Sequence, residues 1–167
     1  PDAVGISAVT PTLVDAFDVA EKVRQALPGV PILLGGAHAS ALPERTLSEC
    51  PALDYLVAGE GEETVLELLE ALAAQRGAAD IPGLFWREDG SIGKSPPRPI
   101  SNHIDGIPFP SRPLLDRRYY FSPSDTAVRG VFLVSTTLIT SRGCPFKCTF
   151  CGADLIHTRK VRLHSPE

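Results

Sequence analysis

The sequence predicts an α/β protein with a Rossmann-like (flavodoxin-like) parallel sheet, and two observations carry this prediction. Short apolar segments of strand length alternate with longer segments of helical periodicity through the first half of the chain. The strand segments are apolar almost throughout, which is typical of parallel strands that are buried on both faces. We therefore expect helices to cover both sides of the sheet.

Three strands are expected, over residues 3–7, 31–34 and 54–57. Each ends in a turn: at Ser7, at Gly35-Gly36 and at Gly59-Glu60-Gly61. Ligands of such sheets bind beyond the carboxyl ends of the strands. The three turns therefore predict a ligand-binding rim along one edge of the sheet.

Three helical segments are interleaved with these strands. In the first, Thr10 is interpreted as the N-cap and Pro11 as the first helical residue, and Pro28-Gly29 ends the helix. Its apolar face comprises Leu13, Ala16, Phe17, Ala20, Val23 and Leu27. A short helix is expected over residues 43–48, and a longer amphipathic helix over residues 63–75. The apolar face of the longer helix comprises Val65, Leu68, Leu69 and Leu72.

The pattern changes after residue 81. Residues 83–87 and 91–94 flank a polar turn and predict a β-hairpin. Prolines then cluster in a connector, and the apolar, β-branched residues 131–140 predict a further strand. We place a first domain at residues 1–95, the connector at 96–130 and the start of a second domain at 131–167.

Composition narrows the class of protein. Of 167 residues, 43% are apolar and 22% are charged, which indicates a globular fold. The net charge of −4 argues against a general nucleic-acid binder. No apolar run approaches the roughly 18 residues of a membrane span, and no secretory signal is visible, so we expect a cytoplasmic protein. The chain starts with Pro and lacks Met, so we expect it to be cut from a longer protein at both ends.

Cys144, Cys148 and Cys151 stand in a C-x3-C-x2-C run, with Phe150 just before the last cysteine. Three thiolates on a four-iron cluster leave one iron open to bind a small molecule. Two other site chemistries compete with this reading. A structural zinc site needs a fourth ligand, for which His157 is the near candidate at an unusual spacing. A ferredoxin-type site needs a fourth cysteine, and the remaining Cys50 is more simply a buried apolar side chain.

The cysteine run resembles the signature of the radical S-adenosylmethionine (SAM) superfamily, C-x3-C-x-aromatic-C. The resemblance implies that Cys144, Cys148 and Cys151 hold a [4Fe-4S] cluster whose open iron chelates SAM. One electron from the cluster would cleave SAM to a 5′-deoxyadenosyl radical. Phe150 would contact the adenine of SAM through its backbone.

The front half carries a second resemblance. Ser7-Ala8-Val9, 25 further residues and Gly35-Gly36 are similar to the second part of a cobalamin-binding signature, with Val9 where that signature has Leu. Together with the cysteine run, the whole chain resembles the cobalamin-binding radical SAM enzymes. The resemblance implies a Rossmann-like cobalamin domain, followed by the first strand and cluster loop of a (β/α) barrel. Ser7, Gly35 and Gly36 would hold the cobalamin.

We therefore expect an enzyme of the methyltransferase or cyclase type that acts on an unactivated small-molecule substrate. The resemblance implies cobalamin, SAM and a [4Fe-4S] cluster as cofactors, and a flavodoxin or ferredoxin as one-electron reductant. One alternative is a radical SAM enzyme whose front domain is a scaffold without cobalamin, and the other is a zinc-stabilised binding module. We expect no turnover from these 167 residues alone. No residue is assigned a catalytic role.

Overall fold

The computed structural model describes residues 1–88, 90–116, 127–128, 131–132, 138–153 and 156–166. The chain forms two compact units. The first unit comprises Pro1–Ser101 together with Gly143–Val161, and the second comprises Asn102–Arg142 together with residues 162–167. Residues of the cysteine run are thus grouped with the front half of the chain.

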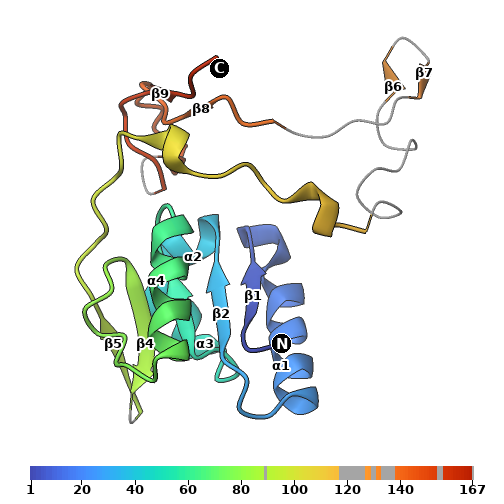
Figure 1. Cartoon of the computed structure of the whole chain (residues 1–167), viewed down its shortest axis with the longest axis vertical. Helices are drawn as coiled ribbons and strands as arrows, with labels where there is room; N and C mark the ends of the chain where they lie inside the picture. The colour runs from blue at the N-terminus through green and yellow to red at the C-terminus, as the bar shows by residue number, and fades with distance from the viewer. Residues whose placement is uncertain (89, 117–126, 129–130, 133–137, 154–155, 167) are drawn as a thin grey trace. The chain divides into compact units, whose positions relative to one another are not determined.

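The first unit contains a five-stranded sheet in the order β1-β2-β3-β4-β5 (Figure 1). Its strands are β1 (Val4–Ser7), β2 (Ile32–Gly35), β3 (Tyr55–Val57), β4 (Leu84–Glu88) and β5 (Ser91–Lys94). The first three are parallel, as the sequence predicts. The expected hairpin is also present, and β4 joins the sheet by pairing antiparallel with β3. The sheet is therefore mostly parallel, with an antiparallel extension at one side.

Helices cover both faces of this sheet (Figure 1). They are α1 (Leu13–Ala26), α2 (Ala37–Ala41), α3 (Pro43–Glu49) and α4 (Glu62–Ala73). Successive residues of β2 point to opposite faces: Ile32 and Leu34 pack in a core with α1, α2 and α3, whereas Leu33 packs in a second core with α4. The expected two-sided burial is confirmed for β2, whereas β1, at the edge of the sheet, has its alternate residues Gly5 and Ser7 exposed.

The start of the first helix differs from the expectation, because Thr10 is not its N-cap. A 3-10 turn, η1 (Thr10–Thr12), comes first, and the α-helix begins at Leu13. The hydroxyl of Thr12 accepts a hydrogen bond from the Val9 N–H (3.2 Å) and donates one to the Val9 carbonyl (3.1 Å). These two bonds close a tight turn that a reading of Thr10 and Pro11 alone does not anticipate.

One residue expected on the buried face of α4 is exposed. Leu68 and Ala71 are buried, whereas Leu69 is 41% exposed. Leu69 lies 100° around the helix from Leu68, which places it beside the buried stripe. Thr64 takes a buried place instead, and its hydroxyl donates to the carbonyl of Pro82 (2.8 Å).

The first residues of the expected connector are held against the first unit. The Gly83 N–H donates to the Pro96 carbonyl (2.8 Å), and Arg98 Nε donates to the Thr64 hydroxyl (2.7 Å). Arg98 Nη2 also pairs with Glu67 (2.6 Å), and the Arg98 side chain is only 13% exposed. Residues 96–98 therefore pack as part of the α/β unit.

The second unit is built from short elements. These are η2 (Ile104–Gly106), η3 (Arg112–Leu114), β6 (Ala127–Val128), β7 (Val131–Phe132), β8 (Ser141–Arg142) and β9 (Arg162–Leu163). β6 pairs with β7, and β8 pairs with β9, both antiparallel. Of the strand expected over residues 131–140, β7 covers the first two residues, 133–137 lie outside the described residues, and 138–140 are irregular. The described residues form no closed barrel.

Within the described ranges, no helix is both long and apolar enough to cross a bilayer.

Candidate functional site

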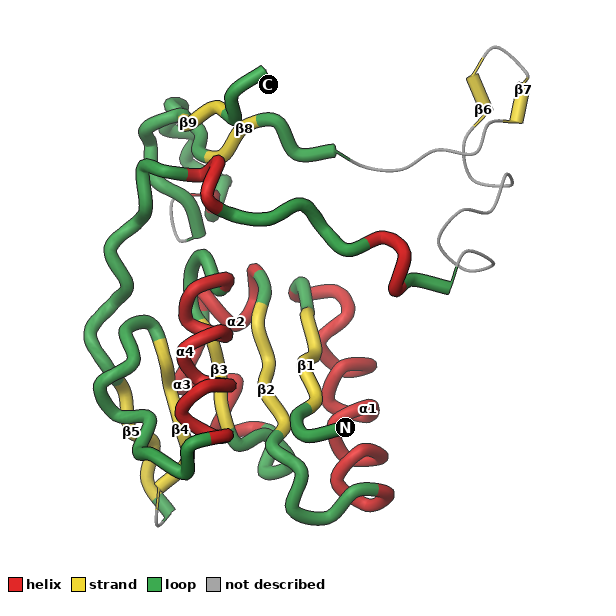
Figure 2. Tube along the Cα trace, in the orientation of Figure 1, coloured by secondary structure: helices red, strands yellow, loops and turns green. Residues whose placement is uncertain are grey.

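The rim predicted from the sequence exists at the carboxyl ends of three neighbouring strands. β1, β2 and β3 lie side by side and parallel (Figure 2), so the loops that follow them share one edge of the sheet. Ser7, at the end of β1, is in register with Gly35, at the end of β2. Two of the three residues expected to hold a cofactor are therefore neighbours, and Gly36 follows directly.

Gly36 is required by the protein's own geometry. Its φ of +99° lies in the region that favours glycine. A Cβ at this position would lie 2.6 Å from the carbonyl oxygen of Ala8 and 2.9 Å from the hydroxyl oxygen of Ser7. The two loops thus approach each other as closely as a residue without a side chain allows.

Gly35 differs from its neighbour. Its φ is not positive, and a Cβ there would meet only the carbonyl oxygen of Val57, at 3.9 Å, which is ordinary contact. The fold itself therefore tolerates a side chain at residue 35. A glycine at this position leaves open space at the end of β2, where a ligand can approach the backbone.

The loops of the rim are joined through α2, a helix that the sequence did not predict. The Ser40 hydroxyl donates to the Gly36 carbonyl (2.9 Å) and accepts from the Gly59 N–H (2.9 Å). His38 Nδ1 lies 3.0 Å from the Thr10 hydroxyl, and the His38 N–H donates to the Ala8 carbonyl (3.3 Å). His38 is thus a buried residue of α2, only 7% exposed.

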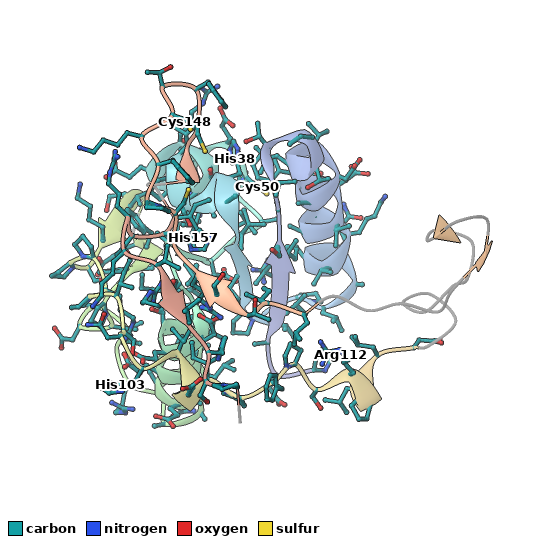
Figure 3. All side chains as sticks on the ribbon, turned by 90° about the horizontal axis from the view of Figure 1, so that it is seen from above. His38, Cys50, His103, Arg112, Cys148 and His157 are labelled. Carbon is teal, nitrogen blue, oxygen red and sulfur yellow. The ribbon has the colours of Figure 1, made fainter. Side chains whose placement is uncertain are left out.

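Glu60 lies in the loop between β3 and α4, and its side chain is only 11% exposed. Its Oε1 lies 3.6 Å from Nδ1 of His157, which belongs to the segment that follows the cysteines. Figure 3 looks down on this edge with His38 and His157 labelled. Glu62 is the first residue of α4, where a carboxylate favours the helix dipole.

The cysteine loop is a closed turn bounded by the paired strands β8 and β9. Gly143, with a φ of +98°, opens the loop, and a Cβ there would collide with the backbone carbonyl of Lys160. The Cys144 N–H donates to the Thr158 carbonyl (3.1 Å), and the Cys151 N–H donates to the Cys148 carbonyl (3.2 Å). Backbone contacts, rather than apolar packing, therefore shape this loop.

The four thiols fall into two environments. Cys144 is half-buried, whereas Cys148 and Cys151 are exposed, as is Phe150 at 92%. Among the described residues, no three His, Cys, Asp or Glu side chains are gathered for a metal ion. Cys50 is 1% exposed in the core beside α3, and burial raises the pKa of its thiol. Its expected role as a buried apolar side chain is confirmed.

Comparison with known proteins shows what kind of domain the front of the chain resembles. The B12 binding domain family matches residues 1–69. The uncharacterized methyltransferase PH0819 of Pyrococcus horikoshii is 41% identical over the whole chain, which covers 35% of that protein. The anaerobic magnesium-protoporphyrin IX monomethyl ester cyclase of Rubrivivax gelatinosus is 31% identical over 91% of the chain and 27% of its own length. The chain thus spans about a quarter to a third of these relatives.

A solved structure supports the fold. The cobalamin-dependent SAM radical enzyme OxsB, with aqua-cobalamin bound, matches 99% of this chain and 22% of its own with a TM-score of 0.68 and 26% identity. The front of the first unit is thus similar to B12 binding domains, and the fold agrees with that similarity. The chain as a whole is similar to part of a cobalamin-dependent SAM radical enzyme, a methyltransferase and a cyclase.

The residues that join the rim loops were missed by sequence reasoning. Thr10 and Ser40 carry no recognisable motif, and their partners lie 28 and 19 residues away along the chain. One local signal existed for Ser40. A serine four residues after a glycine at a strand end is placed to return its hydroxyl to that glycine's carbonyl.

Proposed function

We propose that this chain supplies the cobalamin-binding rim and the cluster loop of a cobalamin-dependent radical SAM enzyme. The observation that carries this function is the pairing of Ser7 with Gly35 at the carboxyl ends of neighbouring parallel strands, where a Cβ at residue 35 would meet only the Val57 carbonyl oxygen, at 3.9 Å. Cobalamin carries a bulky nucleotide tail, and a tail of that size needs a site where no side chain intrudes. Ser7, Gly35 and Gly36 would hold that tail, with the exposed Ser7 hydroxyl available for a hydrogen bond.

Cys144, Cys148 and Cys151 would hold the [4Fe-4S] cluster. The donor set fits, because all three are free thiols on one loop and iron–sulfur clusters are held by cysteine thiolates. When bound, the cluster supplies one electron and an open iron for the reductive cleavage of SAM. Phe150 would contact the adenine of SAM through its backbone. The solvent-exposed side chains of Cys148 and Cys151 make this loop open to a cluster.

The reaction would be methyl transfer or cyclisation on an unactivated small molecule, with a flavodoxin or ferredoxin as the electron donor. Methyltransferase and cyclase relatives support these two outcomes. The chain's own residues would bind and orient the cofactors. Cobalamin binding by the front domain would distinguish this function from that of a radical SAM enzyme whose front domain is a scaffold without cobalamin.

The test uses the full-length protein, reconstituted without oxygen. We expect about four iron and four sulfide per chain, and a visible-spectrum shift of hydroxocobalamin on binding. Replacing Cys144, Cys148 and Cys151 together with Ala should abolish iron binding but leave cobalamin binding. A protein that takes up iron but no cobalamin would make the front domain a scaffold. Stoichiometric zinc without a response to SAM would indicate the binding module.

A further inference from the structure

Three rim loops that are distant in sequence are tied to one short helix, α2. Ser40 bridges the Gly36 carbonyl after β2 and the Gly59 N–H after β3, with both distances 2.9 Å. His38, on the same helix, lies 3.0 Å from the Thr10 hydroxyl in the loop after β1. One turn of helix therefore makes a hydrogen bond to each of the three loops.

These contacts differ from ordinary helix packing. Gly36 and Gly59 both have positive φ angles, +99° and +80°, and a Cβ at Gly59 would meet nothing within 4 Å. Neither Gly36 nor Gly59 has a side chain that could hold its loop. The Ser40 hydroxyl is hydrogen-bonded to both loops. It sets the distance between the Gly36 and Gly59 backbones.

The buried ring of His38 contacts the third rim loop, which follows β1. It is 7% exposed, and its Nδ1 contact with Thr10 holds the loop that carries Ser7 and Ala8. The backbone N–H of His38 donates to the Ala8 carbonyl. The oxygen of that carbonyl is the atom nearest to the position that a Cβ on Gly36 would take. The position of the Ala8 backbone relative to Gly36 therefore depends on His38 and Thr10.

We propose, on the basis of the cobalamin function above, that Ser40, His38 and Thr10 are positioning residues that preorganise the three rim loops for the nucleotide tail. They do not touch the ligand. They hold the three loops in the geometry that the tail needs, so that less conformational entropy is lost when the ligand binds. The selectivity for a corrin with a tail over one without it is then set by these three residues.

The experiment measures the affinity of the full-length protein for hydroxocobalamin and for cobinamide, a corrin without the nucleotide tail, by visible spectroscopy. Ser40→Ala should weaken hydroxocobalamin binding about tenfold, since a bridging hydroxyl is lost, and should leave cobinamide binding within about twofold. Thr10→Val, which keeps the size of the side chain but removes the hydroxyl, should act in the same direction. Ser40→Thr keeps the hydroxyl and should bind hydroxocobalamin better than Ser40→Ala.

Ser48→Ala is the matched control, because the Ser48 hydroxyl donates only to the Arg45 carbonyl (2.7 Å) within α3. It should change neither affinity. If Ser40→Ala retains the wild-type preference for hydroxocobalamin, or loses both corrins equally, the positioning role is wrong. If the wild-type protein binds neither corrin, the proposed function itself fails, so the two failures are distinguishable.

Discussion

Nδ1 of His157 lies 3.6 Å from Oε1 of Glu60, and this contact joins the cysteine loop to the rim of the sheet within the first unit. The distance is too long for a hydrogen bond but within reach of an ion pair, and Nδ1 is buried without a hydrogen-bond partner among the described residues. The segment after the cysteines and the loop after β3 are thus neighbours. It is a direct side-chain contact between the loops proposed for the two cofactors.

Replacing Glu60 with Gln should loosen the cysteine loop. A partly exposed ion pair contributes about 0–1 kcal/mol, so hydrogen exchange of residues 143–158 should rise by up to about fivefold. Exchange measured by mass spectrometry on peptides of this segment gives the answer. Glu70→Gln, at an exposed position of α4, is the control and should leave exchange unchanged.

The two glycines at the end of β2 should respond differently to alanine. Gly36→Ala places a Cβ 2.6 Å from the Ala8 carbonyl oxygen at a φ of +99°, which costs about 1–3 kcal/mol of folding free energy. Gly35→Ala meets only the Val57 carbonyl at 3.9 Å and should leave the free energy of unfolding within about 0.5 kcal/mol. Urea unfolding, followed by the fluorescence of Trp86, measures both.

The same pair also separates folding from binding. Gly35→Ala should fold like the wild type but bind hydroxocobalamin more weakly, since its methyl group enters the proposed ligand space. Equal cobalamin affinity of Gly35→Ala and wild type would remove Gly35 from the site. An unchanged unfolding free energy for Gly36→Ala would mean that the β1 and β2 loops are further apart than the structure has them.

Local patterns in the sequence are enough to predict most of the sheet, because its parallel strands stand out as short, largely apolar runs that end in turns. Residues 31–34 are all apolar and were therefore expected to form a buried strand, and β2 lies at Ile32–Gly35. The five residues of α2 could not be predicted. They are too few to show a periodic apolar face, and their fold depends on Ser40 and His38 bonding to loops far along the chain. Long-range hydrogen bonds of this kind leave no local signal.

The candidate site was predicted in part for the same reason. Ser7, Gly35 and Gly36 were found because each stands at the end of an apolar run, and parallel pairing brings such ends together. The contact of Glu60 with His157 was not anticipated, since 97 positions in the sequence separate the two residues. The only part of this contact that the sequence indicated was the Gly59-Glu60-Gly61 turn at the end of β3. The end of a strand can be predicted from the local sequence, whereas the distant segment that contacts it cannot.

Arg98 should contribute more to stability than the other ion-paired cation near the hairpin, Lys94. Arg98 donates to the Thr64 hydroxyl and to both oxygens of Glu67, and its side chain is 13% exposed. Lys94 pairs only with Glu44, and both side chains are more than half exposed. Arg98→Ala should therefore lower the free energy of unfolding by about 2 kcal/mol and Lys94→Ala by less than about 0.5 kcal/mol.

Arg98→Lys tests whether the forked geometry matters. A lysine keeps the charge but cannot donate to Thr64 and Glu67 in the same plane, so most of the loss should remain. Urea unfolding of the three variants gives the comparison. Recovery of full stability by lysine would show that charge alone anchors the connector to α4.

When the iron-free protein is alkylated, we expect one thiol to react slowly and the other three to react fast. Burial at 1% exposure shields Cys50 and raises the pKa of its thiol above the ordinary value of 9.0, so little reactive thiolate forms near neutral pH. Cys144, Cys148 and Cys151 lie in a half-buried to exposed loop and should react first. Peptide mass spectrometry after timed alkylation at pH 8 identifies each site.

The raised pKa of Cys50 also fixes the sign of a pH effect. Its folded-state pKa lies above the unfolded value, so the stability that it contributes is fully present below pH 9.0 and is lost as the pH rises through the folded pKa. Cys50→Ala should remove this alkaline loss, at a cost of about 1 kcal/mol at neutral pH for the vacated volume. Cys148→Ala, at an exposed position, should leave the alkaline profile as it is. Rapid alkylation of Cys50 in the folded protein would contradict its place in the core, because a residue buried beneath α3 reacts only when the domain opens.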